Sequence, residues 1–533
     1  MARETRFTLG WLGIRPAWII LLVGIAVYTV ALSHASIQRV ANFETGVTDL
    51  GHLDNHMWRM SQGRWINTYN TTVMYNGAGH TSLILYALAP LYWMGFGLKG
   101  ALAVQSLILA LGSVPLYLLA VRLLRREGPA LVLALVYLTY APLHFANLDD
   151  FHPEVFGTTA MLFAAYFMEQ RRERLTLVMA GLSLMCKETY AFSLIGLSLL
   201  SLTRREFRLA GALVGLALLW WFPIQSAVSG AHYGTAGKPN WGSAYAGDMG
   251  DTAGQVLVYV LRRPWHLWAR FAEPQSLLYM AQLLAPVAAL CLLCPRWLLP
   301  ALPALAFNVL SEWLPTRMIV FRYTAPITPF IWLATVQAAG RVARWSLRRS
   351  AGPGEAASAP RRVGAVSCWV VPTLVLVVAG VVHLGRPAAY NERQLSRAAN
   401  AAHSEAMKRA VALVPDDASV SAQYYFVPHL STRDRVYWFP MPFWRYQVEN
   451  PEYMYQLAPL DAALVRERLR QEQVQYVLVD GRGFPDTSQL RAPYDAPMSG
   501  EALRQAVELV RTSDLYDEVF AEDGVAVFRL RAS

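Results

Sequence analysis

Long apolar stretches separated by short arginine-rich segments dominate the first 384 residues of the chain. A helix needs roughly 17 to 25 mainly apolar residues to cross a membrane, and about eleven stretches approach or reach that length. We expect spans at 17–33, 100–121, 128–145, 155–169, 175–187, 190–203, 209–227, 276–294, 297–314, 322–340 and 363–384. The pattern predicts an all-α polytopic membrane domain over residues 1–384.

The arginine clusters indicate how the chain threads the membrane. After Arg3 and Arg6 they lie at 122–126, 171–174, 204–208 and 341–362. Short loops rich in Lys and Arg stay in the cytoplasm, so we expect a cytoplasmic amino terminus and, after an odd number of crossings, an extracytoplasmic carboxyl terminus. These features predict a multi-pass protein of the bacterial inner (plasma) membrane.

The apolar stretch 81–96 is the exception to this threading. Counting it as a further span would place the arginine cluster at 122–126 outside the cell. We therefore expect it to form an interfacial or re-entrant helix.

Beyond Gly385 the apolar runs become short and alternate with amphipathic stretches. Helices are expected at 391–413, 460–471 and 500–511, and strands at 418–422, 436–438, 476–479 and 525–530. The alternation predicts a small soluble α/β domain over residues 385–533, on the extracytoplasmic side.

Composition and charge support the membrane assignment and exclude one class of partner. Hydrophobic residues form 55% and charged residues 16% of the 533 residues, against roughly 45 to 50% and about 25% in soluble proteins. A net charge of +10 would suit a nucleic-acid binder if it lay in one exposed domain. Of 47 Lys and Arg and 37 Asp and Glu, however, 17 and 20 lie from Leu384 onward, which leaves 30 and 17 before it. The surplus belongs to the membrane part, and no nucleic-acid partner is expected.

The four cysteines, Cys186, Cys291, Cys294 and Cys368, all fall in apolar spans. The C-x-x-C spacing of the middle pair lacks the second ligand pair that a zinc site needs. We expect buried thiols and no disulfide framework.

The first outer loop, residues 48–58, holds two acids and two histidines. On a helix His52 and His56 would share a face, as metal ligands can. Asp49 could cap the helix that follows or could take a proton from a substrate. Both roles are compatible, because a capping carboxylate sits at an exposed helix start.

The second outer loop, residues 147–154, is dense in polar groups. It could be a solvated turn in which Pro153 starts the next helix. It could also bind a divalent cation or an acceptor through Asp149, Asp150, His152 and Glu154.

Two further sets of charged residues lie near the expected membrane boundary. Lys187 and Glu188 separate two short apolar segments, at a depth where charge must be paired or wet, so they form a mutual pair or part of a site. Arg317, Arg322 and Tyr323 lie at the outer ends of spans, where arginine can snorkel to headgroups or grip a lipid-linked phosphate.

Several short motifs occur in a fixed order along the chain. They are Asp49-Leu50-Gly51 through Asp54 and Trp58 to Gly63, Phe151-His152-Pro153-Glu154, Lys187-Glu188, Arg322-Tyr323, and Val427-Pro428-His429-Leu430-Ser431 through Arg435 and Tyr437 to Pro440. In this order they resemble a family of bacterial and archaeal predicted membrane proteins, domain of unknown function 2079, over nearly the whole chain. That family in turn resembles the C-type glycosyltransferases, multi-span enzymes that take a sugar from a polyprenyl-phosphate donor and use an acid in the first outer loop.

The resemblance implies a function and a set of site residues. Asp49 matches the catalytic acid and would act as general base in an inverting transfer. Asp54 stays an alternative, because Leu50 stands where the C-type pattern has a second acid. The implied substrate-binding residues are His152, Glu154, Lys187, Glu188, Arg322 and Tyr323, and the implied metal ligands are Asp149 and Asp150. The implied partners are membrane lipid and a polyprenyl-phosphate-linked sugar donor, with a divalent cation as cofactor.

Two other classes of function stay open. A transporter would place ionisable groups along a midplane path and often shows inverted halves, whereas here most lie at the outer boundary. A non-catalytic membrane scaffold with an outer recognition domain is the other. Convergence of Asp49, His152, Glu154, Lys187 and Arg322 on one place would favour the enzyme. The sugar, the acceptor and the oligomeric state cannot be read from the sequence.

Overall fold

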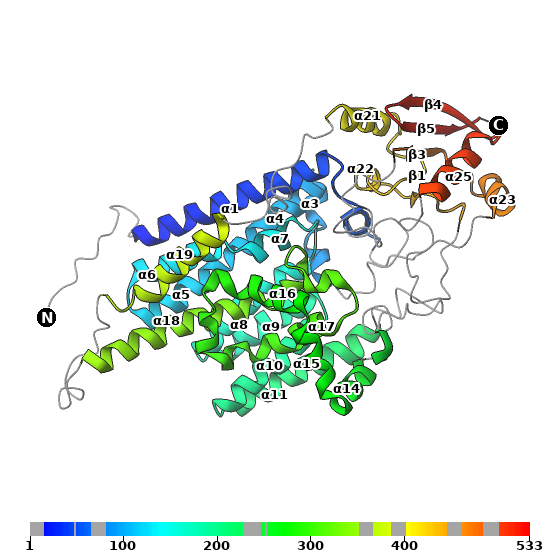
Figure 1. Ribbon diagram of the computed structural model, residues 1–533. Helices are drawn as coiled ribbons and strands as arrows, with labels where there is room; N and C mark the ends of the chain where they lie inside the picture. The colour runs from blue at the N-terminus through cyan, green and yellow to red at the C-terminus, as the bar shows by residue number, and fades with distance from the viewer. Residues whose placement is uncertain are drawn as a thin grey trace.

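The computed structural model describes residues 15–46, 50–64, 82–227, 247–250, 253–350, 366–384, 401–444, 461–482 and 500–532. Its first part is a bundle of helices, and its last part contains a small sheet (Figure 1). The helices of the bundle are α1 (Pro16–Ala41), α2 (His52–Ser61), α3 (Pro90–Trp93), α4 (Gly97–Leu111), α5 (Ser113–Leu124), α6 (Glu127–Tyr137), α7 (Ala141–Leu148), α8 (Glu154–Glu169), α9 (Glu173–Cys186), α10 (Tyr190–Thr203), α11 (Phe207–Leu219), α14 (Ala253–Arg262), α15 (Pro264–Ala272), α16 (Pro274–Leu284), α17 (Leu302–Leu310), α18 (Thr328–Ser350) and α19 (Val370–Leu384).

The expected number of eleven crossings is not confirmed. Among the described residues, three helices are long and apolar enough to cross a membrane, Pro16–Ala41, Gly97–Leu124 and Phe207–Ala227. A fourth is possible if α6 and α7, bent by 42° at their junction, form one span. The other expected spans coincide with helices that are too short, too charged or interrupted.

Proline accounts for much of this interruption. The segments expected as continuous spans at 276–294 and 297–314 contain the 3-10 helices η7 (Ala285–Val287), η8 (Leu290–Leu293) and η9 (Pro295–Ala301). Pro286, Pro295 and Pro300 fall within these pieces. Proline removes a backbone donor and clashes with the preceding turn, so the α-helices break there.

The stretch expected as an interfacial or re-entrant helix, 81–96, is also broken. It contains the 3-10 helix η4 (Leu83–Ala87) and the short helix α3. The hydroxyl of Ser82 donates to the carbonyl of Cys186 at 3.0 Å, and η4 packs against α9. These pieces therefore lie on the bundle, next to the loop after α9.

Ion pairs hold the arginine-rich loops together at one end of the bundle. Arg15 pairs with Glu127, and Arg204 pairs with Glu169. Arg122 donates to the backbone carbonyl of Glu169 at 2.8 Å. The basic loops that the sequence places in the cytoplasm thus share one end, and the opposite ends of α1, α7, α8 and α9 meet at the other.

The carboxyl-terminal part contains a five-stranded sheet in the order β2-β1-β3-β5-β4. Its strands are β1 (Val420–Ala422), β2 (Val436–Trp438), β3 (Tyr476–Asp480), β4 (Tyr516–Glu522) and β5 (Val525–Leu530), and its helices are α21 (Ala401–Ala412), α22 (Val427–Leu430), α23 (Ala462–Glu472) and α25 (Gly500–Arg511). β1 runs parallel to β2 and β3, whereas β5 runs antiparallel to β3 and β4.

The alternating helices and strands expected in this part are therefore present, with one strand more than predicted. β4 is the additional strand; it lies at the edge of the sheet and is mostly exposed, so its sequence lacks the apolar run that indicates a strand. The domain boundary proposed at residue 384 adjoins residues 385–400, which lie outside the described part.

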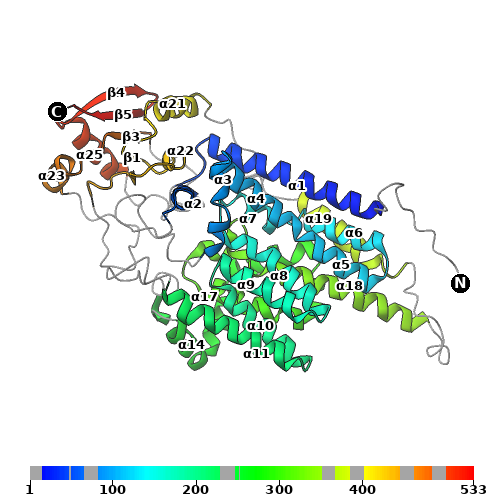
Figure 2. The same ribbon diagram turned by 180° about the vertical axis from the view of Figure 1, so that it is seen from behind.

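The described residues form two large hydrophobic cores, one in the helical bundle and one around the sheet. Phe43, in the loop after α1, belongs to the core of the sheet. Figures 1 and 2 show the sheet beyond the end of the bundle at which α1 finishes. The first loop of the chain thus connects the two parts directly.

Candidate functional site

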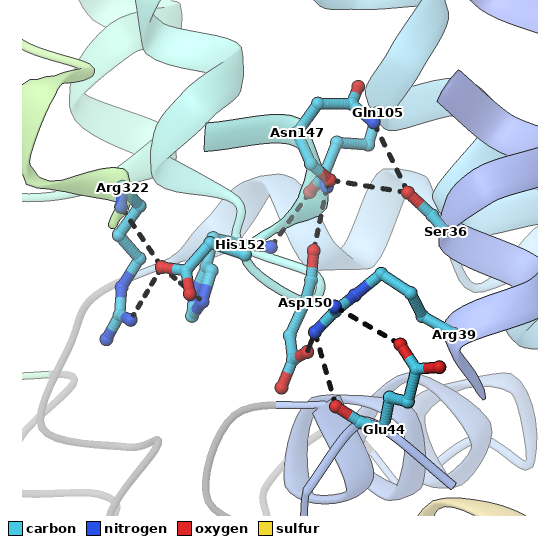
Figure 3. A network of polar contacts seen from close by, with 9 residues as sticks. Ser36, Arg39, Glu44, Gln105, Asn147, Asp150, His152 and Arg322 are labelled. Carbon is cyan, nitrogen blue, oxygen red and sulfur yellow. Dashed lines mark hydrogen bonds and ion pairs between the residues drawn. The ribbon is translucent and has the colours of Figure 1, made fainter. Parts of the chain in front are cut away.

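The turn between α7 and α8 is held by one buried amide side chain. Gln105 of α4 donates through Nε2 to the backbone carbonyls of Asn147 and Asp150, both at 2.9 Å. Its Oε1 accepts from the backbone N–H of His152 at 2.9 Å. Figure 3 shows this arrangement, in which a glutamine satisfies one backbone group in the last turn of α7 and two in the irregular turn that follows.

The same turn is also tied to α1. The side-chain amide of Asn147 donates to the hydroxyl of Ser36 at 3.3 Å, and that hydroxyl lies 3.4 Å from the Asn147 carbonyl. Asp150 adopts a left-handed backbone conformation, φ +56°, which aspartate tolerates better than most residues. The turn therefore has a fixed shape set by contacts from α1 and α4.

Four charged side chains from three separate segments meet beside this turn. The Lys187 ammonium pairs with the carboxylate of Glu154. Arg322 pairs with both acids: its Nε lies 3.2 Å from Glu154 Oε1 and its Nη1 3.4 Å from Asp149 Oδ2. The backbone N–H of Arg322 also donates to Asp149 Oδ2 at 3.0 Å. We call these four residues the ion cluster.

Burial makes this pairing necessary. The side chains of Asp149 and Glu154 are 3% and 6% exposed, and that of Lys187 is 10% exposed. Moving an ion from water into the protein interior costs several kcal/mol unless an oppositely charged partner compensates. Breaking a buried ion pair by removing one partner therefore destabilises a protein by roughly 3 to 5 kcal/mol. Two cations and two carboxylates balance each other, so the ion cluster carries no net formal charge.

Aromatic rings and a further hydrogen bond surround the ion cluster. The ring of Tyr323 lies 5.0 Å from the Arg322 guanidinium and 6.0 Å from the Lys187 ammonium, within the range of cation–π attraction. The hydroxyl of Tyr190 donates to the carbonyl of Glu154 at 2.8 Å. The first turn of α8 is thereby held against α10.

The remaining predicted binding residues lie close by. His152 Nε2 is 3.8 Å from Asp149 Oδ2, so the histidine adjoins the ion cluster. Glu188 follows Lys187 directly and is also buried. The structure therefore gathers His152, Glu154, Lys187 and Arg322 in one place, although the sequence spreads them over 171 positions, from 152 to 322.

Arg39 is a charged residue that the sequence analysis missed. It lies in the last turn of α1, buried, with Nη1 3.4 Å from the Glu44 carboxylate and Nη2 4.0 Å from Asp150 Oδ1. Figure 3 shows it facing the turn on the side opposite Arg322. Arginines are expected at the inner ends of spans. The position of Arg39 at the outer end of the first span was therefore the sequence feature that could have revealed it. For Gln105 the signal was an amide inside an apolar stretch.

Asp54, the alternative catalytic acid, joins α2 to the carboxyl-terminal part. One carboxylate oxygen accepts from the Tyr92 hydroxyl and the other from the Ser431 hydroxyl. The neighbouring Asn55 side chain donates to the carbonyls of Ser431 and Arg433 at 2.5 and 2.9 Å. Burial raises the pKa of Asp54 to about 6, while the two hydroxyl hydrogen bonds act in the opposite direction.

Asp49 lies outside the described residues, together with Val47 and Thr48. The described glycines on either side contact the carboxyl-terminal part closely. A Cβ at Gly46 would lie 1.9 Å from the ring of Tyr424, and one at Gly51 would lie 3.1 Å from a methyl group of Val427. The two points at which the chain leaves and re-enters the described structure are therefore packed against the segment that precedes and includes α22.

The predicted metal ligands are engaged by arginines. Asp149 is paired with Arg322, and Asp150 lies 4.0 Å from Arg39. His52 and His56 share a helix face, with ring centroids 6.4 Å apart. Within the part of the chain that the structure describes, no group of three or more His, Cys, Asp or Glu side chains is placed to hold a metal ion. The divalent cation therefore stays a prediction, and the donor set described here does not favour it.

Comparison with known families identifies the chain. The family described as predicted membrane protein, DUF2079, matches residues 39–481, which include the ion cluster, α2 and three of the five strands of the sheet. The chain belongs to this family. No curated protein matches it in sequence.

Solved structures show what fold this DUF2079 member has. ArnT from Cupriavidus metallidurans bound to undecaprenyl phosphate is similar over 97% of this chain and 98% of its own, with a TM-score of 0.51 at 13% identity. The apo state of the same protein gives a TM-score of 0.48 at 14% identity, over 96% of this chain and 97% of its own. An Archaeoglobus fulgidus oligosaccharyltransferase tethered to an acceptor peptide gives a TM-score of 0.44 at 10% identity, over 97% of this chain and 74% of its own. The first likeness shows that this family member shares the overall fold of that ArnT.

Replacing Gln105 by Met should loosen the turn between α7 and α8. Three hydrogen bonds worth about 1 kcal/mol each would be lost, so local opening should become easier and amide hydrogen exchange in a peptide covering 147–152 should rise at least about tenfold. Gln337→Met is the matched control, because Gln337 is a buried glutamine of α18 whose amide nitrogen has no hydrogen-bond acceptor among the described residues. Equal protection of this peptide in both variants would contradict the assigned role.

Asp54 should make stability depend on pH. Its folded-state pKa of about 6 lies above its ordinary value of 3.8, so the folded protein holds the proton more tightly and this contribution to stability is lost as pH rises from about 4 through about 6. The loss amounts to about 3 kcal/mol, at 1.36 kcal/mol per pKa unit. The unfolding free energy of wild type minus that of Asp54→Asn should fall by about this amount between those pH values. Asp434→Asn, which alters an exposed acid, should show no such trend, and a flat difference for Asp54→Asn would refute the prediction.

Proposed function

We propose that the protein is an integral-membrane glycosyltransferase that moves a sugar from a polyprenyl-phosphate donor to an acceptor on the extracytoplasmic side of the membrane. The observation that carries the proposal is the convergence of His152, Glu154, Lys187 and Arg322 in one buried cluster. This cluster lies at a single end of a bundle whose fold is similar to that of ArnT. A scaffold would not need a buried lysine and a largely buried arginine at one point.

The two cations of the ion cluster supply the contacts for the donor phosphate. Guanidinium groups bind phosphate through paired hydrogen bonds, and a lysine adds a compact point charge. In the structure Glu154 and Asp149 hold Arg322 in a defined orientation. In the proposed complex the phosphate competes with Glu154 for the Lys187 ammonium, while Asp149 keeps the Arg322 backbone in place.

The chemical step is a single displacement. The acceptor hydroxyl oxygen attacks the anomeric carbon, its proton passes to the carboxylate of Asp49, and the bond from that carbon to the phosphate oxygen breaks. The polyprenyl phosphate leaves with the bonding pair, and Arg322 stabilises the charge that develops on it. A single attack from the opposite face inverts the anomeric configuration.

Asp49 is a better choice of base than Asp54. Each carboxylate oxygen of Asp54 already accepts a hydroxyl hydrogen bond, and the group is buried between α2, Tyr92 and Ser431. A base needs an oxygen within hydrogen-bond reach of the substrate proton. Asp54 therefore serves the attachment of α2 to the carboxyl-terminal part.

The neighbouring residues have positioning roles in this proposal. His152, Glu188 and Tyr323 contact the sugar or the acceptor at the edge of the ion cluster. Asp149 and Asp150 orient the two arginines that flank the turn, and the mechanism has no step through a metal. The sheet domain, which packs against Phe43, Gly46 and Gly51 of the first loop, selects the acceptor.

Asp49→Asn should remove most of the transfer activity. Loss of a general base lowers the rate by about 10²- to 10⁴-fold. Membranes that contain the variant would be assayed with a radiolabelled polyprenyl-phosphate sugar and membrane acceptors, at matched expression. Asp434→Asn makes the same chemical change at an exposed position and should leave transfer intact. Undiminished transfer by the Asp49 variant would exclude this residue as the base.

Arg322→Lys should weaken the grip on the donor. Lysine keeps the charge but loses the paired hydrogen bonds of the guanidinium, so the donor concentration at half-maximal rate should rise at least about tenfold, the factor for 1.4 kcal/mol. Arg317→Lys is the matched control: Arg317 lies five positions earlier and is also buried in an ion pair, with Glu273. Equal effects of the two changes on the donor dependence would show that Arg322 has no special role.

A further inference from the structure

Two short helices, α14 and α15, are apolar on two opposite sides. On one side Val256, Tyr259, Val260 and Leu267 pack against Leu310 of α17. On the other side Leu257, Val258, Leu261, Trp265 and Trp268 are exposed, the two tryptophans by 65% and 71%. Large apolar side chains exposed together on two successive helices mark an interaction surface.

These helices cannot be membrane spans. α14 has 10 residues and α15 has 9, so at 1.5 Å per residue each is about 15 Å long, half of the roughly 30 Å apolar core of a bilayer. The break between them at Arg263 and Pro264 keeps them separate. An exposed apolar face on a helix of this length is typical of helices that lie in the plane of the membrane surface.

The charge of this region is of one sign. Residues 253–272 contain three arginines and no Asp or Glu. Arg270 is neutralised by Glu273 and Glu312, whereas Arg262 and Arg263 are exposed at the corner between the helices. Arg263 lies against the Tyr259 ring at 4.9 Å. A surface that combines exposed tryptophan and arginine next to apolar side chains suits the boundary between acyl chains and headgroups.

The position of the two helices agrees with such a surface. Arg317 pairs with Glu273, the residue after α15, and the 3-10 helix η10 (Leu314–Arg317) packs against η11 (Arg322–Thr324), which carries Arg322. In Figures 1 and 2, α14 lies at the same end of the bundle as the carboxyl-terminal sheet. The helices therefore lie at the level of the ion cluster, where a bilayer around the bundle would reach its surface.

We propose that α14 and α15 form a membrane-surface elbow that binds anionic phospholipid. Trp265, Trp268 and Leu261 insert among the acyl chains, and Arg262 and Arg263 contact headgroup phosphates. An arginine close to an anionic membrane surface strengthens attachment by about fivefold, so the pair favours anionic over zwitterionic lipid by more than tenfold. This inference does not depend on the proposed transfer reaction.

The test compares thermal unfolding of the full-length protein in nanodiscs of phosphatidylcholine with that in discs containing phosphatidylglycerol. Wild type should unfold at a higher temperature with phosphatidylglycerol, and the rise should shrink at about 1 M salt, where the Debye length is about 3 Å. The double variant Arg262→Gln, Arg263→Gln should lose at least half of the rise. The control, Arg409→Gln with Arg531→Gln, removes equal charge from exposed positions around the sheet and should keep it.

Each alternative outcome overturns the proposal. It fails if wild type shows no rise, if both double variants lose it equally, or if inorganic phosphate in phosphatidylcholine discs gives the same rise as phosphatidylglycerol. A second measurement is independent of stability: lipids brominated near the headgroup should quench wild-type tryptophan fluorescence more than that of Trp265→Phe, Trp268→Phe. Equal fractional quenching would place the tryptophans away from the bilayer.

Discussion

The requirement that a buried charge be paired organises one end of this molecule. Lys187, Arg322, Asp149 and Glu154 come from segments that are far apart in the sequence, and none could be buried alone at a tolerable cost. Their mutual pairing fixes the start of α8, the loop after α9 and the segment before α18 relative to one another. Two of these residues flank the turn between α7 and α8, whose shape depends on Gln105. The hydrogen bonds of Gln105 go to backbone groups of Asn147, Asp150 and His152, so it positions the charged residues through their neighbours.

The two ends of the bundle use charge differently. At the arginine-rich end, pairs such as Arg15 with Glu127 are exposed to solvent, and such pairs contribute little individually. At the other end Asp149, Glu154 and Lys187 are buried and share partners with the largely buried Arg322, so removing one member leaves another uncompensated. This asymmetry suits a structural role of the charges at the first end and the proposed chemical role of those at the second, where the proposed elbow of α14 and α15 also lies.

The sequence predicted those properties that depend on local pattern, and it predicted less well those that depend on packing. Helix and strand positions in the carboxyl-terminal part followed from apolar spacing, because each element buries one face; β4 did not, because it is an exposed edge strand. The count of eleven spans is not confirmed, because Pro286, Pro295 and Pro300 interrupt apolar segments that composition alone cannot distinguish from continuous helices. Of the site, the residue types and their grouping were predictable from the cost of charge near a membrane. The partners were not: Lys187 pairs with Glu154, 33 positions away, and Arg39 and Gln105 entered only through contacts between helices.

Neutrality of the ion cluster constrains how an anionic donor can bind. A site with two unpaired cations would bind many anions, whereas here each cation is already held by a carboxylate, and an incoming phosphate must match or replace those contacts. The Arg322 guanidinium can keep its contact with Asp149 while its Nε exchanges Glu154 for the phosphate. Its backbone need not move, because the backbone N–H of Arg322 donates to the same Asp149 carboxylate. In the proposed reaction this arrangement makes binding selective for a phosphate that arrives in one orientation. A freely diffusing anion binds poorly, because it makes no further contact to offset the loss of the carboxylate that it displaces. In this proposal the lipid chain of the donor supplies that additional binding energy, and the buried acids exclude small anions in favour of a substrate anchored in the membrane.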